Sequence, residues 1–162
     1  GAISPSHEHF ITNLVKQKIH IQTELIQRKQ APQENQKVFV LYLPENEIHE
    51  LGILFLNYYI LAQNYKTIFL GQSLTTESLQ TVMTFSDNLT FVTHLTVEPN
   101  KEEINDYLKN FYETILSGSQ SNLNILGPLQ TFINPSALPP QIKLHPTFES
   151  FRLEFFGEQI FV

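Results

Sequence analysis

The 162-residue sequence contains no cysteine, which excludes disulfide bonds and metal sites built from thiolates. A chain without cysteine fits a reducing compartment. The sequence also lacks any run of about eighteen apolar residues, and its N-terminus lacks the basic, apolar and small-residue pattern of a signal peptide. We therefore expect no passage through a membrane and no export, and we predict a cytoplasmic location.

Basic residues are few, with 10 Lys and Arg against 16 Asp and Glu and a formal net charge of -6. A surface that holds phosphate backbones is normally basic, so we do not expect this chain by itself to bind DNA well. The hydrophobic content of 41% is enough to bury a core. Length and composition together indicate one domain with a terminal extension.

The extension is predicted to be a long amphipathic helix from Ser4 to about Lys29. Ser4 followed by Pro5 suits a helix start. Apolar residues then recur at helical spacing and form one stripe, which must pack on another element: Phe10, Ile11, Leu14, Val15, Ile19, Leu25 and Ile26.

Residues 30–37 have loop composition and predict a linker. The boundary therefore separates an extension, residues 1–30, from a domain, residues 36–162. The sequence opens abruptly on Gly-Ala-Ile-Ser, which suggests a piece cut from a longer protein that carries part of the function elsewhere.

Short apolar runs alternate with helical patterns along the domain. The apolar runs predict five buried strands, at 38–43, 67–70, 89–95, 123–126 and 141–144. Helical spacing predicts helices at 47–63, from about 75 to 83, from 100 to 118, and from about 148 to 153. This alternation predicts an α/β fold with a doubly wound parallel sheet.

The segment after the first predicted strand, Glu47-Ile-His-Glu-Leu-Gly52, carries the residues with chemical potential. Ligands of open α/β sheets bind at the carboxyl ends of the strands. An imidazole there is a good metal ligand, and a carboxylate two residues earlier can hold its other ring nitrogen. A glycine at Gly52 lets the start of the helix approach a bulky planar ligand. An ordinary histidine at a helix start, capped by Glu47, is the alternative interpretation.

The order acid, any, His, any, any, Gly in this segment resembles the signature of cobalamin-binding domains that bind the cofactor through a histidine. The resemblance implies that His49 is the lower axial ligand of cobalt and that Glu47 hydrogen-bonds it, while Gly52 matches outright. It also implies a flavodoxin-like (Rossmann-like) five-stranded sheet and a cofactor such as adenosylcobalamin or a related corrinoid.

Two features are more similar to the MerR-type, light- and cobalamin-sensing transcriptional regulators than to mutases or methyltransferases. One is the stretch 47–74, with Leu-Gly-Gln-Ser-Leu after the second strand, and the other is the pair Glu8-His9. In those regulators such a pair lies over the upper face of the corrin. The resemblance implies that residues 1–30 are the C-terminal helix of a truncated helical bundle, with a DNA-binding domain further upstream.

The sequence departs from the family pattern around the slot for the dimethylbenzimidazole tail. The family has Ser-any-Leu on strand three, where this chain has Thr93 and Leu95, and Gly-Gly after strand four, where this chain has Leu126 and Gly127. A Leu126 side chain in the slot would overpack it at a cost of about 1 to 3 kcal/mol, and about 1.4 kcal/mol weakens binding tenfold. Cobalamin binding is therefore expected to be weakened or lost if Leu126 faces the slot.

The other histidines have simpler interpretations. His94 is expected to be a packed histidine at a strand end, with a place near the nucleotide tail as the alternative. We expect His20 and His145 to lie on the surface or in turns. His7 and His9 are two positions apart on a helix and point in different directions, so a shared metal is not expected.

The resemblance implies a sensory domain and not an enzyme. Cobalamin would change how protomers assemble into a homo-oligomer, and DNA would be bound only through the missing domain. Two alternatives stay open: a corrinoid carrier for a methyltransferase or mutase, and a degenerate domain that no longer binds cobalamin and serves protein association.

Overall fold

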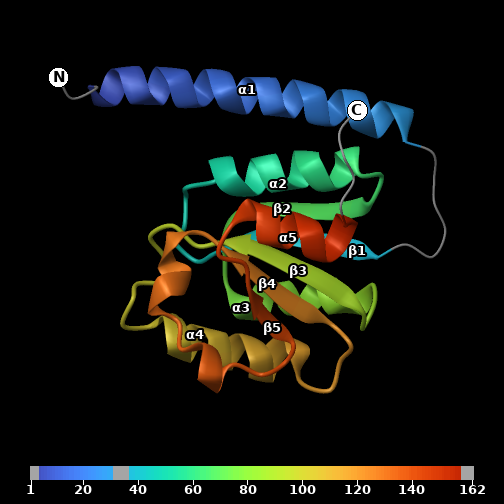
Figure 1. Ribbon diagram of the computed structural model, residues 1–162, viewed down its shortest axis with the longest axis vertical. Helices are drawn as coiled ribbons and strands as arrows, with labels where there is room; N and C mark the ends of the chain where they lie inside the picture. Colours follow the sequence, from blue (N-terminus) through green and yellow to red (C-terminus); the bar gives the residue numbers. More distant parts are fainter. Residues whose placement is uncertain (1–3, 31–36, 158–162) are drawn as a thin grey trace.

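The computed structural model describes residues 4–30 and 37–157, and a five-stranded parallel sheet forms its centre (Figure 1). The strand order is β2-β1-β3-β4-β5, and every neighbouring pair is parallel. The strands are β1 (Val38–Pro44), β2 (Lys66–Leu74), β3 (Leu89–His94), β4 (Asn122–Leu126) and β5 (Ile142–Leu144). The predicted flavodoxin-like sheet is confirmed.

Helices cover both faces of the sheet and complete a three-layer arrangement (Figure 1). One face carries α2 (Leu51–Ala62) and α5 (Phe148–Phe156), and the other carries α3 (Thr76–Leu79) and α4 (Ile104–Phe111). Single helical turns extend or join these elements, at Gln80–Thr84, Tyr112–Leu116, Pro128–Phe132 and Pro135–Ala137. The long helix α1 (Pro5–Lys29) lies outside α2 as an additional layer.

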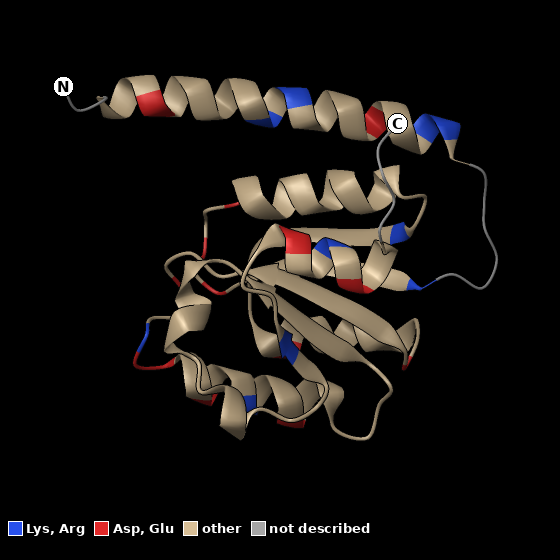
Figure 2. Ribbon diagram, in the orientation of Figure 1, with Lys and Arg blue, Asp and Glu red and all other residues tan. Residues whose placement is uncertain are grey.

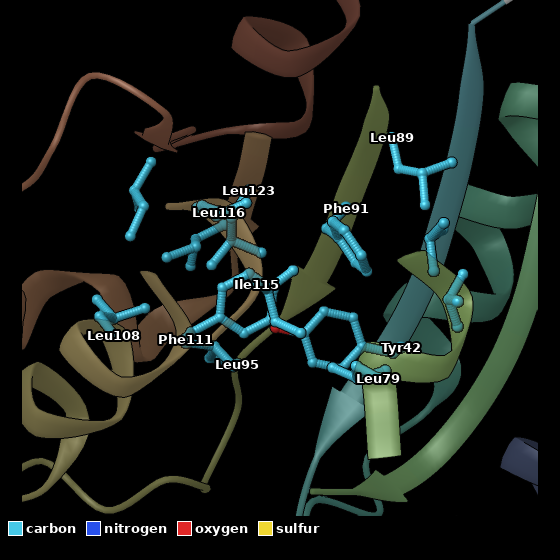
Figure 3. Packing of buried hydrophobic residues seen from close by; sticks show 14 of the residues in the cluster. Tyr42, Leu79, Leu89, Phe91, Leu95, Leu108, Phe111, Ile115, Leu116 and Leu123 are labelled. Carbon is cyan, nitrogen blue, oxygen red and sulfur yellow. The ribbon is translucent and has the colours of Figure 1, made fainter. Parts of the chain in front are cut away.

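Alternating side chains of β1 divide the core between the two faces. Phe39 and Leu41 belong to the cluster beneath α2 and α5, whereas Val40 and Tyr42 belong to the cluster on the α3 and α4 side. Tyr42 stacks on Phe111 at 5.7 Å between ring centroids, and Figure 3 shows these two rings within that second cluster. Because both faces of β1 are apolar, the strand is packed in the core on both sides. Its carboxyl end therefore holds the following loop in a defined position.

Three predicted helix boundaries were wrong. Helix α2 begins at Leu51 and not at Glu47, because the Glu47 side chain accepts hydrogen bonds from nearby backbone and holds residues 47–50 as a loop. Helix α4 ends at Phe111, and one wider π-helical turn, Tyr112–Leu116, replaces its expected continuation to Gly118. Helix α4 also begins at Ile104 and not at residue 100, and the Asn100 carboxamide instead accepts hydrogen bonds from the backbone N–H groups of Glu102 and Glu103 in the turn before it.

Helix α1 has the predicted extent, but only Ile19 and Ile26 of the predicted apolar stripe belong to its contact face. The half-buried residues against α2 are Thr12, Lys16, Ile19, Thr23 and Ile26. Lys16 forms an ion pair of 2.8 Å with Glu50, and Gln30 Nε2 donates to the Leu61 carbonyl at 2.5 Å. Phe10 and Leu14 of the predicted stripe remain 64% and 44% exposed.

Figure 2 shows lysines and arginines distributed over several elements, with acidic residues among them. Within residues 4–30 and 37–157, none of the helices combines the length and apolar character needed to cross a lipid bilayer.

Gly127 is required by the backbone at the end of β4. Its φ is +99°, and a Cβ atom there would lie 2.3 Å from the Leu95 carbonyl oxygen. We expect Gly127→Ala to lower the free energy of unfolding by more than about 2 kcal/mol, because positive φ and a backbone clash add. Urea unfolding measures this change. Gly118→Ala is the matched control, since Gly118 has φ +77° but nothing within 4 Å of a Cβ, and it should cost only about 1 kcal/mol. Equal losses in the two variants would contradict the clash.

Candidate functional site

The loop between β1 and α2 places Glu47 and His49 at the carboxyl edge of the sheet. A turn at Pro44 starts the loop, with the Glu47 N–H donating to the Pro44 carbonyl at 3.0 Å. Glu47 Oε1 then accepts from the His49 backbone N–H at 2.9 Å and lies 2.7 Å from His49 Nδ1. One carboxylate oxygen therefore fixes both the backbone and the ring of His49.

The second oxygen of Glu47 joins this loop to the loop after β3. Oε2 accepts from the backbone N–H groups of Thr96, Val97 and Glu98 at 3.1, 2.7 and 2.9 Å. Burial of the fully enclosed carboxyl disfavours its charge, but these hydrogen bonds and those from His49 outweigh it and lower the pKa of Glu47 from 4.5 to about 2. The carboxylate is therefore ionised at neutral pH.

The His49 ring itself reaches solvent, with 53% of its side chain exposed. Because Nδ1 faces the ionised Glu47 carboxylate, Nδ1 carries the proton and the lone pair of the neutral ring is on Nε2. No hydrogen bond to Nε2 is formed by the described part of the chain. This arrangement, a carboxylate behind an imidazole with a free nitrogen in front, is how proteins orient a histidine toward a metal.

Helix α1 extends beyond the start of α2, as Figure 1 shows. Lys16 meets Glu50 at that start. Glu8 and His9 lie eight and seven positions before Lys16, about two helical turns, so they share its face of the helix. Both are exposed. Glu8 and His9 therefore belong to the N-terminal part of α1, before the ion pair that joins this helix to the start of α2.

A pocket of about 580 Å³ opens beside this loop, between the strand ends and the starts of α2 and α5. Its wall includes Gly52, Phe55 and Leu56 from α2, His94 from β3, Leu126 and Gly127 from β4, and residues 144–148. Gln130 and Thr131 close another side. The lining is mostly apolar with a few polar groups, which is the usual character of a small-molecule site.

Gly52 is explained by His94 and not by empty space. A Cβ atom on Gly52 would lie 2.8 Å from His94 Cδ2 and 2.9 Å from Cγ, so the imidazole packs directly on the glycine. His94 Nδ1 lies 3.2 Å from Thr96 Oγ1, and burial lowers the pKa of His94. The space that the sequence suggested for a planar ligand is taken by a side chain of the protein.

The other slot residues predicted from the sequence divide into two groups. Leu126 and Gly127 line the pocket, and Leu126 is also buried in the core beneath α2 and α5. Thr93 and Leu95 are buried but do not line it, and Leu95 belongs to the cluster on the opposite face. The Thr93 hydroxyl has no hydrogen-bond partner in the described part of the chain.

His145 was expected on the surface or in a turn, and it does follow the end of β5, but it is buried and not at the surface. The ring is only 2% exposed, Nε2 lies 2.9 Å from Asn124 Oδ1, and the residue lines the pocket. Its position directly after the apolar residues of β5 was the available signal, because such positions lie at the ligand-binding edge of a parallel sheet. His94 carried the same signal at the end of β3.

Among the described residues, no group of three or more His, Cys, Asp and Glu side chains is placed to hold a metal ion. A metal here would therefore need most of its ligands from a bound cofactor. His49 fits such a group as a single nitrogen donor.

The fold is similar to a solved structure described as the monomethylamine corrinoid protein of Methanosarcina barkeri, with a TM-score of 0.54 and 10% identity. The match covers 82% of this chain and 57% of that protein, so this chain corresponds to little more than half of its length. No protein-family model and no curated protein sequence matches this chain. At this identity the likeness shows the fold alone.

The lowered pKa of Glu47 predicts a specific loss of stability in acid. A carboxyl group with a depressed folded-state pKa stabilises the fold above its unfolded pKa, and this contribution disappears as pH falls from about 4.5 toward 2. A fall in the pKa from 4.5 to about 2 corresponds to about 3 kcal/mol, most of which is lost by pH 3. Urea unfolding between pH 7 and pH 3 should show this loss in the native protein.

Glu47→Gln should lower stability at pH 7 by a similar amount and flatten the pH dependence in that interval. Glu45→Gln is the control, because Glu45 is an exposed carboxylate two positions away. A pH profile of Glu47→Gln that is parallel to that of the native protein would show that Glu47 does not carry the acid sensitivity.

Proposed function

We propose that this chain binds a corrinoid through His49 and serves as the cobalamin-sensing domain of a MerR-type transcriptional regulator. The observation that carries the proposal is the exposed His49 imidazole held from behind by the buried, ionised Glu47. A histidine needed only for packing would not require such an orientation of an exposed ring.

The residues present fit a corrinoid at the axial position. A bound corrinoid would supply a cobalt ion, and His49 would hold it as a nitrogen donor. His49 has the free Nε2 nitrogen for that role, and the Glu47 carboxylate holds the Nδ1 proton and orients the ring. The fold, similar to that of a corrinoid protein, supports the same cofactor.

The geometry of α1 favours the regulator among the possible corrinoid proteins. Glu8 and His9 are exposed and lie about two helical turns before Lys16, whose ion pair with Glu50 joins α1 to the residue that follows His49. In the MerR-type regulators a Glu-His pair covers the upper face of the corrin. We propose the same place for Glu8 and His9, so that the cofactor would lie between α1 and the sheet.

The proposed mechanism is control of assembly by the ligand. Glu50, which holds Lys16 of α1, follows His49 directly in the chain, so a ligand bound to His49 bears on both elements. Contacts that differ between two assembly states supply the coupling free energy. The changed assembly of a homo-oligomer would then alter DNA binding by a domain outside this chain.

A corrinoid carrier for a methyltransferase or mutase is the second candidate, favoured by the likeness to the Methanosarcina barkeri corrinoid protein. A carrier presents its cofactor to a partner enzyme and needs an open upper face. Helix α1 extends beyond the start of α2 (Figure 1), and we prefer the regulator because we propose that this part of α1 would cover the cofactor. In the degenerate alternative, the chain would fold and associate without any corrinoid.

The axial role is tested by titrating the native protein and His49→Ala with hydroxocobalamin and adenosylcobalamin while recording the visible spectrum. We expect the corrin bands to shift with the native protein, and affinity to fall at least about tenfold in His49→Ala, because the nitrogen donor is lost. His20→Ala, a histidine exposed on α1, is the control and should behave like the native protein. A band shift that survives in His49→Ala would remove His49 from the axial role.

The assembly mechanism is tested by measuring the molar mass in solution with light scattering, with and without adenosylcobalamin in the dark. We expect a change to a different whole-number multiple of the 18.7 kDa chain. The same measurement on His49→Ala should show no change on adding the ligand. An unchanged mass in the native protein, with the ligand bound, would favour the carrier over the regulator.

A further inference from the structure

The corrinoid proposed above has two parts, a corrin ring with its cobalt and a nucleotide tail, and they would meet different surroundings in this structure. The ring and cobalt would lie at the exposed His49, whereas a nucleotide tail would need an enclosed place below. The pocket of about 580 Å³ is large enough for such a group and borders the same loop through Gly52. Access of the tail to this pocket depends on the side chains that lie on the route between the pocket and His49.

His94 borders both ends of that route. Its ring packs on Gly52, where a Cβ would be only 2.8 to 3.0 Å from three ring atoms. The same ring lines the pocket and is close enough to feel the charge of Glu47, the partner of His49. A group that passes from beneath His49 into the pocket therefore meets the His94 imidazole first.

Displacing the His94 imidazole would disturb each of the groups that surround it. Helix α2 begins at residue 51, so Gly52 cannot retreat without shifting the first turn of the helix. His94 Nδ1 would lose its contact with Thr96 Oγ1. Leu126, on the neighbouring strand, lines the pocket and is 5% exposed, so it gives the ring little free space on that side. Insertion of a group into packed surroundings of this kind weakens binding by about tenfold or more.

We propose that His94 makes this site discriminate between corrinoids by the nucleotide tail on the lower face of the corrin. Corrinoids that lack this tail would bind more tightly than complete cobalamin. The inference rests on the proposed function and deepens it. His94 determines specificity for the tail. His49 would bind the cobalt of corrinoids with or without a tail.

The test is a comparison of two ligands and three proteins by absorbance titration. Hydroxocobalamin carries the nucleotide tail, and aquocobinamide has the same ring without it. The proteins are the native chain, His94→Ser, which removes the ring but keeps a small polar group, and Thr131→Ala. Thr131 is an exposed residue on another wall of the same pocket and is the matched control.

We expect the native chain and Thr131→Ala to bind aquocobinamide at least about tenfold more tightly than hydroxocobalamin. In His94→Ser the affinity for hydroxocobalamin should rise by about tenfold or more, with little change for aquocobinamide. Because cobalamin must also release its own base, the change of the ratio on substitution carries the test. His94→Gly is a second variant, and circular dichroism checks that each protein is folded.

An unchanged ratio of the two affinities in folded His94→Ser or His94→Gly would overturn the role of His94 while leaving the proposed function in place. Tighter binding of hydroxocobalamin than of aquocobinamide by the native chain would do the same. Absence of binding by either ligand to all the folded proteins would overturn the proposed function, and the selectivity of His94 with it.

Discussion

The buried carboxylate of Glu47 is the constraint on which the candidate site depends. Five hydrogen bonds converge on its two oxygens, two from His49 and three from the backbone of residues 96–98. A buried charge is tolerated only when it is satisfied in this way. The same bonds delay the start of α2, join the loops after β1 and β3, and hold the His49 ring with Nε2 toward solvent.

The fold was predictable because its signals are redundant. Continuous apolar strands such as β1, alternating with helical patterns, predict a parallel sheet without any knowledge of a ligand, and the strand order follows from the resemblance. The Glu47–His49 contact was also predicted, since the two residues are close in sequence and the chemistry of the pair is simple. The start of α2 was not, because three of the groups that hold Glu47 come from a distant loop.

The details of the pocket were least accessible to sequence reasoning. Gly52 suggested room for a ligand, but the neighbour that uses the room is His94, which lies on another strand more than forty positions away. Gly127 matched the family, yet its positive φ and the closeness of Leu95 are sufficient reasons for a glycine there. Long-range packing decides both cases, and a linear pattern does not contain it.

The shallow attachment of α1 also affects how the molecule opens. Helix α1 contains no fully buried residue and is tied down chiefly by half-buried side chains, one ion pair and one hydrogen bond from the residue that ends it. Detachment of such a layer costs far less free energy than unfolding of the sheet. The protein is therefore expected to pass through a state in which the sheet is intact and the outer helix is undocked, with its amides exchanging with solvent faster than those of β1.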